Sequence, residues 1–255
     1  MLLVDTKAGK LISDDELKNQ YANAQPYGEW LDSNLTYLTD IPIPNERVPE
    51  LSNEERSRLQ KAFGYTYEEF KTAILPMAQN GAEAIAAMGD DTPLAVLSNQ
   101  KLPLFNYFHQ LFAQVNRTPP IDAIREEIVT STTVYVGKDG NLLKEQPENC
   151  QVLKVNNPIL TNTDMLKIKH MHVEGFRVAE VPITYYKSTK LERAIERLFV
   201  EVDKAYRDGA NILVLTDRGV DENRVPMPSL LAVSAVHQHL VKTKKRTSLA
   251  VILES

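Results

Sequence analysis

The chain has 255 residues, of which 43% are hydrophobic and 25% are charged, so it can bury a core as one large α/β domain or as two small ones. Its net charge of −5, without a large basic block, argues against nucleic acid or an anionic membrane as the main partner. Cys150 is the only cysteine, which excludes an internal disulfide and a cysteine-ligated zinc or iron–sulfur site. Because there is no secretion signal and no apolar run of membrane-spanning length, we expect a cytoplasmic protein.

The first fifty residues predict a hairpin followed by a linker. Two short apolar strands, 1–5 and 10–12, flank a turn that contains Gly9, and Ser13 or Asp14 is a suitable N-cap for a helix that follows. Residues 25–49 contain several prolines and little periodicity, which is typical of a linker that crosses a surface. We therefore expect an N-terminal hairpin and linker over 1–50 and a central α/β domain over 51–255.

The next hundred residues predict helices, one strand and an irregular excursion. A helix begins at Ser52 and ends at Gly64, and another begins at Thr66 and ends near Gly81. Residues 92–98, almost fully apolar, are typical of a buried parallel strand. Apolar side chains from Phe105 to Val115 recur at helical spacing. Residues 137–160 show no periodicity, and we expect them to be irregular.

The last third carries the clearest pattern. Strand-like segments at 176–186, 211–216 and 248–254 alternate with amphipathic or apolar helices at 191–206 and 229–242. Pro182 weakens the first strand, because proline cannot donate to a ladder. This β-α-β-α-β order predicts a parallel sheet with right-handed crossover helices, in a β/α pattern that is interrupted rather than finished.

Asp217 and Arg218 are the clearest candidates for chemistry. They follow the predicted strand 211–216, and ligands of α/β sheets bind at the carboxyl ends of the strands. There they could orient a substrate or another loop. The alternative is a local salt bridge, with Ser229 as N-cap of the next helix.

Other polar clusters give weaker signals. The turn 88–93 could hold an anion through its backbone amides, although its two adjacent aspartates favour a plain turn. His237 and His239 project to different sides of a helix, and His170 and His172 lack a third ligand, so no metal site is expected. The sequence contains no dinucleotide-binding, phosphate-loop, nucleophile-elbow or zinc-protease motif.

A corner between two expected helices, within 112–127, is dense in polar and charged side chains. Burying such groups without partners is costly, so the corner makes sense as an interface with another domain or as the lining of a narrow path. The alternative is an exposed corner in which Pro119 and Pro120 start the second helix. The polar residues are Gln114, Asn116, Arg117, Asp122, Arg125 and Glu126.

Several long stretches resemble the central domain of the glutamate synthase large subunit. They are "MGDDTPLAVLS", "YFHQLFAQVNRTPPIDAIREEIV", "RDGANILVLTDRGV" and "PSLLAVSAVHQHLV", in this order. The opening "MLLVDTKAGKLISDDELK" resembles the end of the amidotransferase domain of that enzyme, and "PYGEWL" resembles its linker. The resemblance implies a rudimentary or incomplete (β/α) barrel-like domain with an extended N-terminal linker region.

The resemblance also implies a function. Glutamate synthase releases ammonia from glutamine in an N-terminal amidotransferase domain and passes it through a tunnel to an FMN-binding domain, where 2-oxoglutarate is reductively aminated to glutamate. We expect this chain to join those flanking domains and help form the ammonia route, with FMN and an iron–sulfur cluster bound elsewhere in the parent enzyme. An NADPH-oxidising small subunit or ferredoxin would supply electrons.

The departures from the family pattern predict no activity for the segment alone. The amidotransferase nucleophile of the family is an N-terminal cysteine, whereas this chain begins with Met1, and Cys150 lies in a segment expected to be irregular. We expect no cofactor, metal or complete active site in this chain. The alternative hypothesis is an independent barrel-like enzyme with a pocket at the strand ends near Asp217.

Overall fold

The computed structural model describes residues 3–46, 50–85, 94–108 and 131–255. A parallel sheet of three strands forms its centre, in the order β10-β8-β6. The strands are β6 (Val178–Pro182), β8 (Ile212–Thr216) and β10 (Ala250–Glu254). They are the three strands predicted for the last third, and their parallel pairing is confirmed. The described residues contain no closed barrel, which agrees with a rudimentary barrel-like domain.

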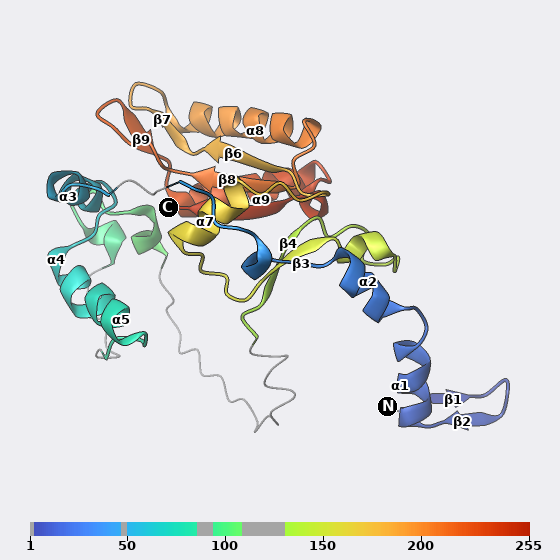
Figure 1. Ribbon diagram of the computed structural model, residues 1–255. Helices are drawn as coiled ribbons and strands as arrows, with labels where there is room; N and C mark the ends of the chain where they lie inside the picture. The colour runs from blue at the N-terminus through green and yellow to red at the C-terminus, as the bar shows by residue number, and fades with distance from the viewer. Residues whose placement is uncertain (1–2, 47–49, 86–93, 109–130) are drawn as a thin grey trace.

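Helices α8 (Leu191–Arg207) and α9 (Ser229–Lys242) cover one face of this sheet (Figure 1). Leu198, Val202 and Leu240 pack there against Leu213 and Leu215 of β8, and each is at most 2% exposed. Every residue of β8 is buried, as expected for a strand covered on both faces.

The opposite face packs on α7 (Asn162–Lys169) and on a second small sheet. That sheet has the order β3-β5-β4, formed by Thr36–Tyr37, Val152–Val155 and Val134–Gly137. Ile212 and Val214 meet Leu153 and Ile168 across this interface. The expectation that 137–160 is irregular is therefore wrong in part, because β5 supplies a fully buried leucine to the core.

The N-terminal segment begins as predicted. Strands β1 (Leu3–Asp5) and β2 (Lys10–Ile12) form an antiparallel hairpin, and α1 (Asp14–Ala22) follows with Ser13 as its N-cap. This part extends away from the central sheet (Figure 1). The linker is more regular than expected, because α2 (Tyr27–Asn34) precedes β3, which pairs with β5.

Residues 51–108 contain helices and turns but no strand among those described. Helix α3 (Asn53–Ala62) begins after Ser52, as predicted, and the structure adds a capping box between Ser52 and Glu55. The expectation of a strand over 92–98 is wrong for the residues of that segment that the structure describes, 94–98. Residues Ala95–Leu97 form a 3-10 turn in which Val96 and Leu97 are 73% and 76% exposed, so these apolar side chains meet no core.

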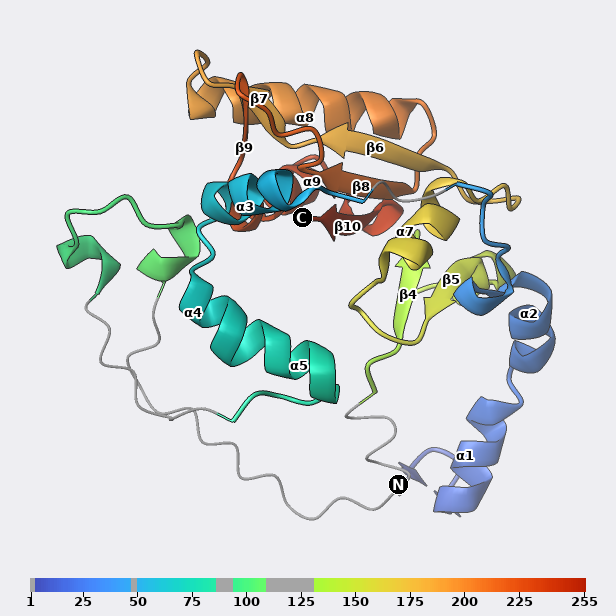
Figure 2. The ribbon, with the colours of Figure 1, turned by 60° about the vertical axis from the view of Figure 1, so that its left-hand side comes forward.

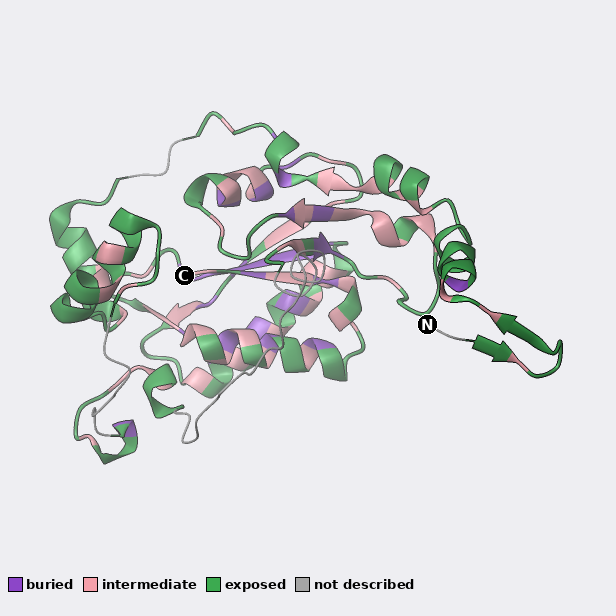
Figure 3. Cartoon of the chain, turned by 90° about the horizontal axis from the view of Figure 1, so that it is seen from below, coloured by how far each residue is buried: buried purple, intermediate pink, exposed green. Residues whose placement is uncertain are grey.

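The helix expected from Phe105 onward does not begin as an α-helix. Residues Leu104–Tyr107 form a short 3-10 helix and Phe108 is extended, whereas 109–115 lie outside the described residues. A two-stranded antiparallel ribbon of β7 (Thr184–Tyr186) and β9 (Arg224–Pro226) projects beyond the carboxyl ends of the parallel strands (Figure 2). Buried residues gather on the central strands and the inner sides of α8 and α9, whereas the N-terminal hairpin is largely exposed (Figure 3).

Candidate functional site

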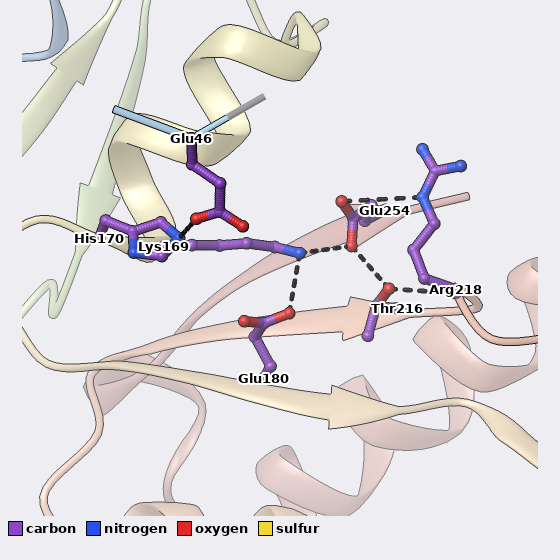
Figure 4. Close-up of polar contacts among 7 residues, drawn as sticks. All are labelled: Glu46, Lys169, His170, Glu180, Thr216, Arg218 and Glu254. Atoms are coloured by element: carbon purple, nitrogen blue, oxygen red, sulfur yellow. Dashed lines mark hydrogen bonds and ion pairs between the residues drawn. The ribbon is translucent and has the colours of Figure 1, made fainter. Parts of the chain in front are cut away.

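The carboxyl edge of the parallel sheet gathers polar side chains from three strands and a helix (Figure 4). The register pairs Glu254 of β10 with Thr216 of β8, and Asp217 and Arg218 follow directly. The C-terminal end of α7 contributes Lys169. The sequence reasoning placed two of these residues at a strand end, and the pairing of parallel strands explains why the others meet them.

Lys169 is the centre of an ion-pair network. Its Nζ lies 2.8 Å from a carboxylate oxygen of Glu180 on β6 and 2.8 Å from one of Glu254. The side chains of Lys169 and Glu254 are only 15% and 12% exposed. Burial alone would lower the pKa of Lys169, but the hydrogen bonds to both carboxylates outweigh burial and raise that pKa. The lysine is therefore held as a cation.

Glu254 is correspondingly held as an anion. Its burial alone would raise the pKa of the carboxyl group, but the hydrogen bonds from Lys169 and Thr216 outweigh burial and lower that pKa. The Thr216 hydroxyl donates to Oε2 at 2.6 Å, and Arg218 Nε lies 3.8 Å from Oε1. Both carboxylate oxygens are thus engaged, which suits a structural role better than the acceptance of a substrate proton.

Asp217 points into the molecule rather than toward solvent. It is 3% exposed, and its Oδ2 accepts a hydrogen bond of 2.6 Å from the Ser255 hydroxyl. Its backbone N–H donates to the Glu254 carbonyl at 3.1 Å. Burial raises the pKa of this carboxyl group, and the hydrogen bond from Ser255 offsets only part of that effect.

The raised pKa of Asp217 predicts that its charge destabilises the fold at neutral pH. The folded state holds the proton more tightly than the unfolded state, so the free energy of unfolding falls as pH rises from the ordinary Asp pKa through the raised one. We expect Asp217→Asn, whose amide oxygen can still accept from Ser255, to be more stable than wild type above that window and similar below it. Urea unfolding at several pH values measures this, and equal profiles for the two proteins would contradict it.

Arg218 lies at the same edge, but its side chain is more exposed than that of Asp217. Its side chain is 56% exposed and its guanidinium extends beyond the network toward solvent (Figure 4). Its guanidinium forms an ion pair with Glu254, so the salt bridge of the alternative interpretation exists with a partner on β10. The predicted capping by Ser229 is wrong, because α9 begins at Ser229 itself and Pro228 occupies the N-cap position without a side-chain bond.

Two open grooves lie along α8, and Asp217 lines neither of them. The larger, of about 380 Å³, separates the first half of α8 from the β7–β9 ribbon and is lined by side chains that include Arg193, Arg197 and Arg224. The smaller, of about 250 Å³, follows the outer edge of β6. The independent-enzyme hypothesis expected a pocket with Asp217 at its rim, and these grooves do not support it.

Three of the histidines in the described part of the chain, His170, His237 and His239, each have a different partner. His170 Nε2 is 2.9 Å from Glu46, His239 Nε2 is 3.1 Å from Asp203, and His237 Nδ1 accepts from Arg246 at 3.0 Å. Within the part of the chain that the structure describes, no three potential metal ligands cluster. Nor does any described helix have the length and apolarity needed to cross a membrane.

Comparison with known proteins decides the family. The family model described as the glutamate synthase central domain matches residues 58–255. The chain belongs to this family. It is 41% identical over its whole length to the glutamate synthase [NADPH] large chain of Bacillus subtilis and 39% identical to the glutamate synthase [NADH] of Schizosaccharomyces pombe. It is 37% identical to ferredoxin-dependent glutamate synthase 2 of Synechocystis.

The chain spans only a small part of these glutamate synthases. Each alignment includes the whole of this chain. It includes only 16% of the Bacillus protein, 13% of the Schizosaccharomyces protein and 16% of the Synechocystis protein. The match therefore assigns this sequence to one domain of a much longer enzyme in each relative.

In this glutamate synthase central domain, the sequence reasoning missed Lys169, Glu180 and Glu254. A signal existed for Glu254, which ends an apolar strand, because a buried carboxylate requires a cationic partner. Glu180 interrupts another apolar strand, but its side chain is 49% exposed. The six candidates between Gln114 and Glu126, and the turn 88–93, lie outside the described residues.

Proposed function

We propose that this chain is the connecting domain of a glutamate synthase. In the proposal, residues 1–50 form a hairpin and linker that follow the amidotransferase domain, and 51–255 form the central domain that precedes the FMN-binding synthase domain. Ammonia released from glutamine passes along a route that this domain helps to form. The parent enzyme then uses it for the reductive synthesis of glutamate from 2-oxoglutarate.

The observation that carries the proposal is the match to enzymes with different electron donors. Relatives named as NADPH, NADH and ferredoxin-dependent glutamate synthases all align over the whole of this chain, at 37% to 41% identity. Because enzymes that use different electron donors all contain this domain, its role should belong to a step that these enzymes share. Joining the two reaction sites and guiding ammonia between them is such a step, whereas entry of electrons is not.

The geometry of the sheet edge supports a role without chemistry of its own. Asp217 is buried against Ser255, and Glu254 is engaged by Lys169, Thr216 and Arg218. Ligands of α/β sheets normally occupy this edge, and here ion pairs and hydrogen bonds fill it. We therefore expect the chain alone to be inactive.

The cofactors of the parent enzyme are assigned to its other domains. An iron–sulfur cluster is held by several cysteine thiolates, and this chain has one cysteine, so its residues do not fit the cluster. We propose that FMN binds to the flanking synthase domain of the parent enzyme. An NADPH-oxidising small subunit or ferredoxin would be the electron-donating partner.

The ammonia route is tested at Arg117 and Arg125, which lie outside the described residues, in the complete enzyme. We expect Arg117→Ala with Arg125→Ala to uncouple the two reactions, so that more glutamine is hydrolysed than glutamate is formed. Supplying free ammonia should restore glutamate formation, because the synthase site itself is unchanged. Arg58→Ala on α3, whose side chain is 72% exposed, is the matched control.

The measured quantity is the ratio of glutamine consumed to glutamate formed, not the rate of either reaction. A loss of both activities together would indicate misfolding, and circular dichroism of the variant identifies that case. An unchanged ratio of glutamine consumed to glutamate formed, in a folded variant, would overturn the role of this corner in the ammonia route.

A further inference from the structure

One helical arm of the domain has an apolar face that nothing in the described structure covers. The arm, residues 67–80, consists of α4 (Tyr67–Glu69), a π-helical turn (Phe70–Ile74) and α5 (Leu75–Asn80). It contains no buried residue. Tyr67, Phe70, Ile74 and Met77, spaced to lie along one side, are 79%, 39%, 40% and 49% exposed.

Local sequence signals specify where this helical arm begins and ends. Thr66 and Glu69 form a capping box at its start, and Gly81 ends it with a φ of 61°. Pro76 cannot donate a backbone hydrogen bond inside the helix, and the π turn directly before it fits this, since Leu75 N–H bonds to the Phe70 carbonyl five residues back. Both ends and the irregularity between them are thus specified locally.

These capping signals alone do not make an isolated helix of this length stable in water. An isolated helix of about 12–15 residues is marginal in water, and helices in proteins gain most of their stability by packing an apolar face. The arm stands apart from the central sheet in the views of Figure 1 and Figure 2. The face therefore requires a surface to pack against.

The composition of the arm indicates a permanent interface. Residues 72–80, "TAILPMAQN", carry no charged side chain, whereas Glu68, Glu69 and Lys71 lie near the start of the helix. Depletion of charge around exposed aliphatic and aromatic side chains is the composition of an interface core, and obligate interfaces are the most apolar. A solvated helix of this length would carry charges along its whole outer face.

We propose that the face of Tyr67, Phe70, Ile74 and Met77 docks against another folded domain of the same polypeptide. This inference rests on the proposed function, because it takes the chain as one domain of a longer enzyme. In the relatives, the matching segment is 13% to 16% of the polypeptide, so most of the chain that could cover the face lies outside this domain. The partner surface is apolar at its centre and needs no charges opposite residues 72–80.

The test places a photo-crosslinking amino acid at Met77 in the complete polypeptide. Gln79 is the matched control, because two residues along a helix point to different sides of it. After irradiation, mass spectrometry of the peptides identifies the partner. We expect Met77 to crosslink to peptides of the same polypeptide that lie outside these 255 residues, and Gln79 to give several-fold less of that product.

Three outcomes would overturn the inference. Crosslinks from Met77 confined to these 255 residues would mean that the chain covers its own face. A product with the mass of two polypeptides would identify a second copy as the occupant. Equal crosslinking from Met77 and Gln79 would mean that the face is not an interface.

The crosslink map is independent of the ammonia route. It needs no catalytic activity, so a failure of the coupling experiment leaves the docking surface standing. As a second measurement, Met77→Asp should make the arm more sensitive to limited proteolysis in the complete polypeptide, whereas Gln79→Asp should not. Equal cleavage of the two variants at the arm would count against the docking surface.

Discussion

Replacing Leu215 by alanine should lower the free energy of unfolding by about 3 kcal/mol, which lies within the range for a buried leucine. Leu215 lies in the central strand β8, has no exposed surface and packs among side chains from α8 and α9. Removing its side-chain carbons leaves a cavity between sheet and helices that rigid neighbours fill only in part. Urea unfolding followed by circular dichroism measures the loss.

The neighbouring strand offers a matched control. Leu253 of β10 is the register partner of Leu215, carries the same side chain and is 40% exposed. Leu253→Ala should cost well under half as much, because less apolar area returns to water and no closed cavity forms. Equal losses for the two variants would mean that the layer of α8 and α9 does not cover β8 as the structure describes.

Replacing Lys169 by methionine should lower the free energy of unfolding by about 2 kcal/mol at neutral pH, since removing one partner of a buried ion pair leaves the other charge uncompensated. Methionine keeps much of the apolar stem, so the change is mainly electrostatic. Glu254, 12% exposed, would then face Glu180 without a cation between them. The variant is compared with wild type by urea unfolding.

Two companion variants isolate the effect. The double variant Lys169→Met with Glu254→Gln should be more stable than the single one, because no uncompensated charge remains in the partly buried position. Lys18→Met removes an exposed ion pair of similar length, 2.6 Å between Lys18 and Asp14, and should change stability little. A double variant less stable than the single one would contradict the account.

The loss should also depend on pH in a defined direction. The pKa of Glu254 is lowered in the folded state, so its contribution is present above the ordinary Glu pKa and is lost as pH falls through the folded value. The pKa of Lys169 is raised, so its contribution is lost only at alkaline pH. The difference between wild type and Lys169→Met should therefore shrink as the solution becomes acidic.

The sequence by itself determined the last third of the domain. Strands over 211–216 and 248–254 and helices over 191–206 and 229–242 are long, strongly patterned segments, and each agrees with the structure within a few residues. Local signals were equally reliable at the helix starts at Ser52 and Thr66 and at the helix end at Gly81, because caps depend on neighbouring residues only. The family was also readable from long stretches of sequence.

Only the tertiary structure decided which apolar segments become strands and which charges meet. Residues 92–98 look like a buried strand, but Ala95–Leu97 form a 3-10 turn in which Val96 and Leu97 are exposed. Residues 152–155, in a segment expected to be irregular, became β5 because β3 and β4 pair with it. Asp217 and Glu254 lie 37 positions apart, and only parallel pairing of β8 with β10 brings them to one edge. Pairing partners and burial depend on segments distant along the chain, so no local pattern contains them.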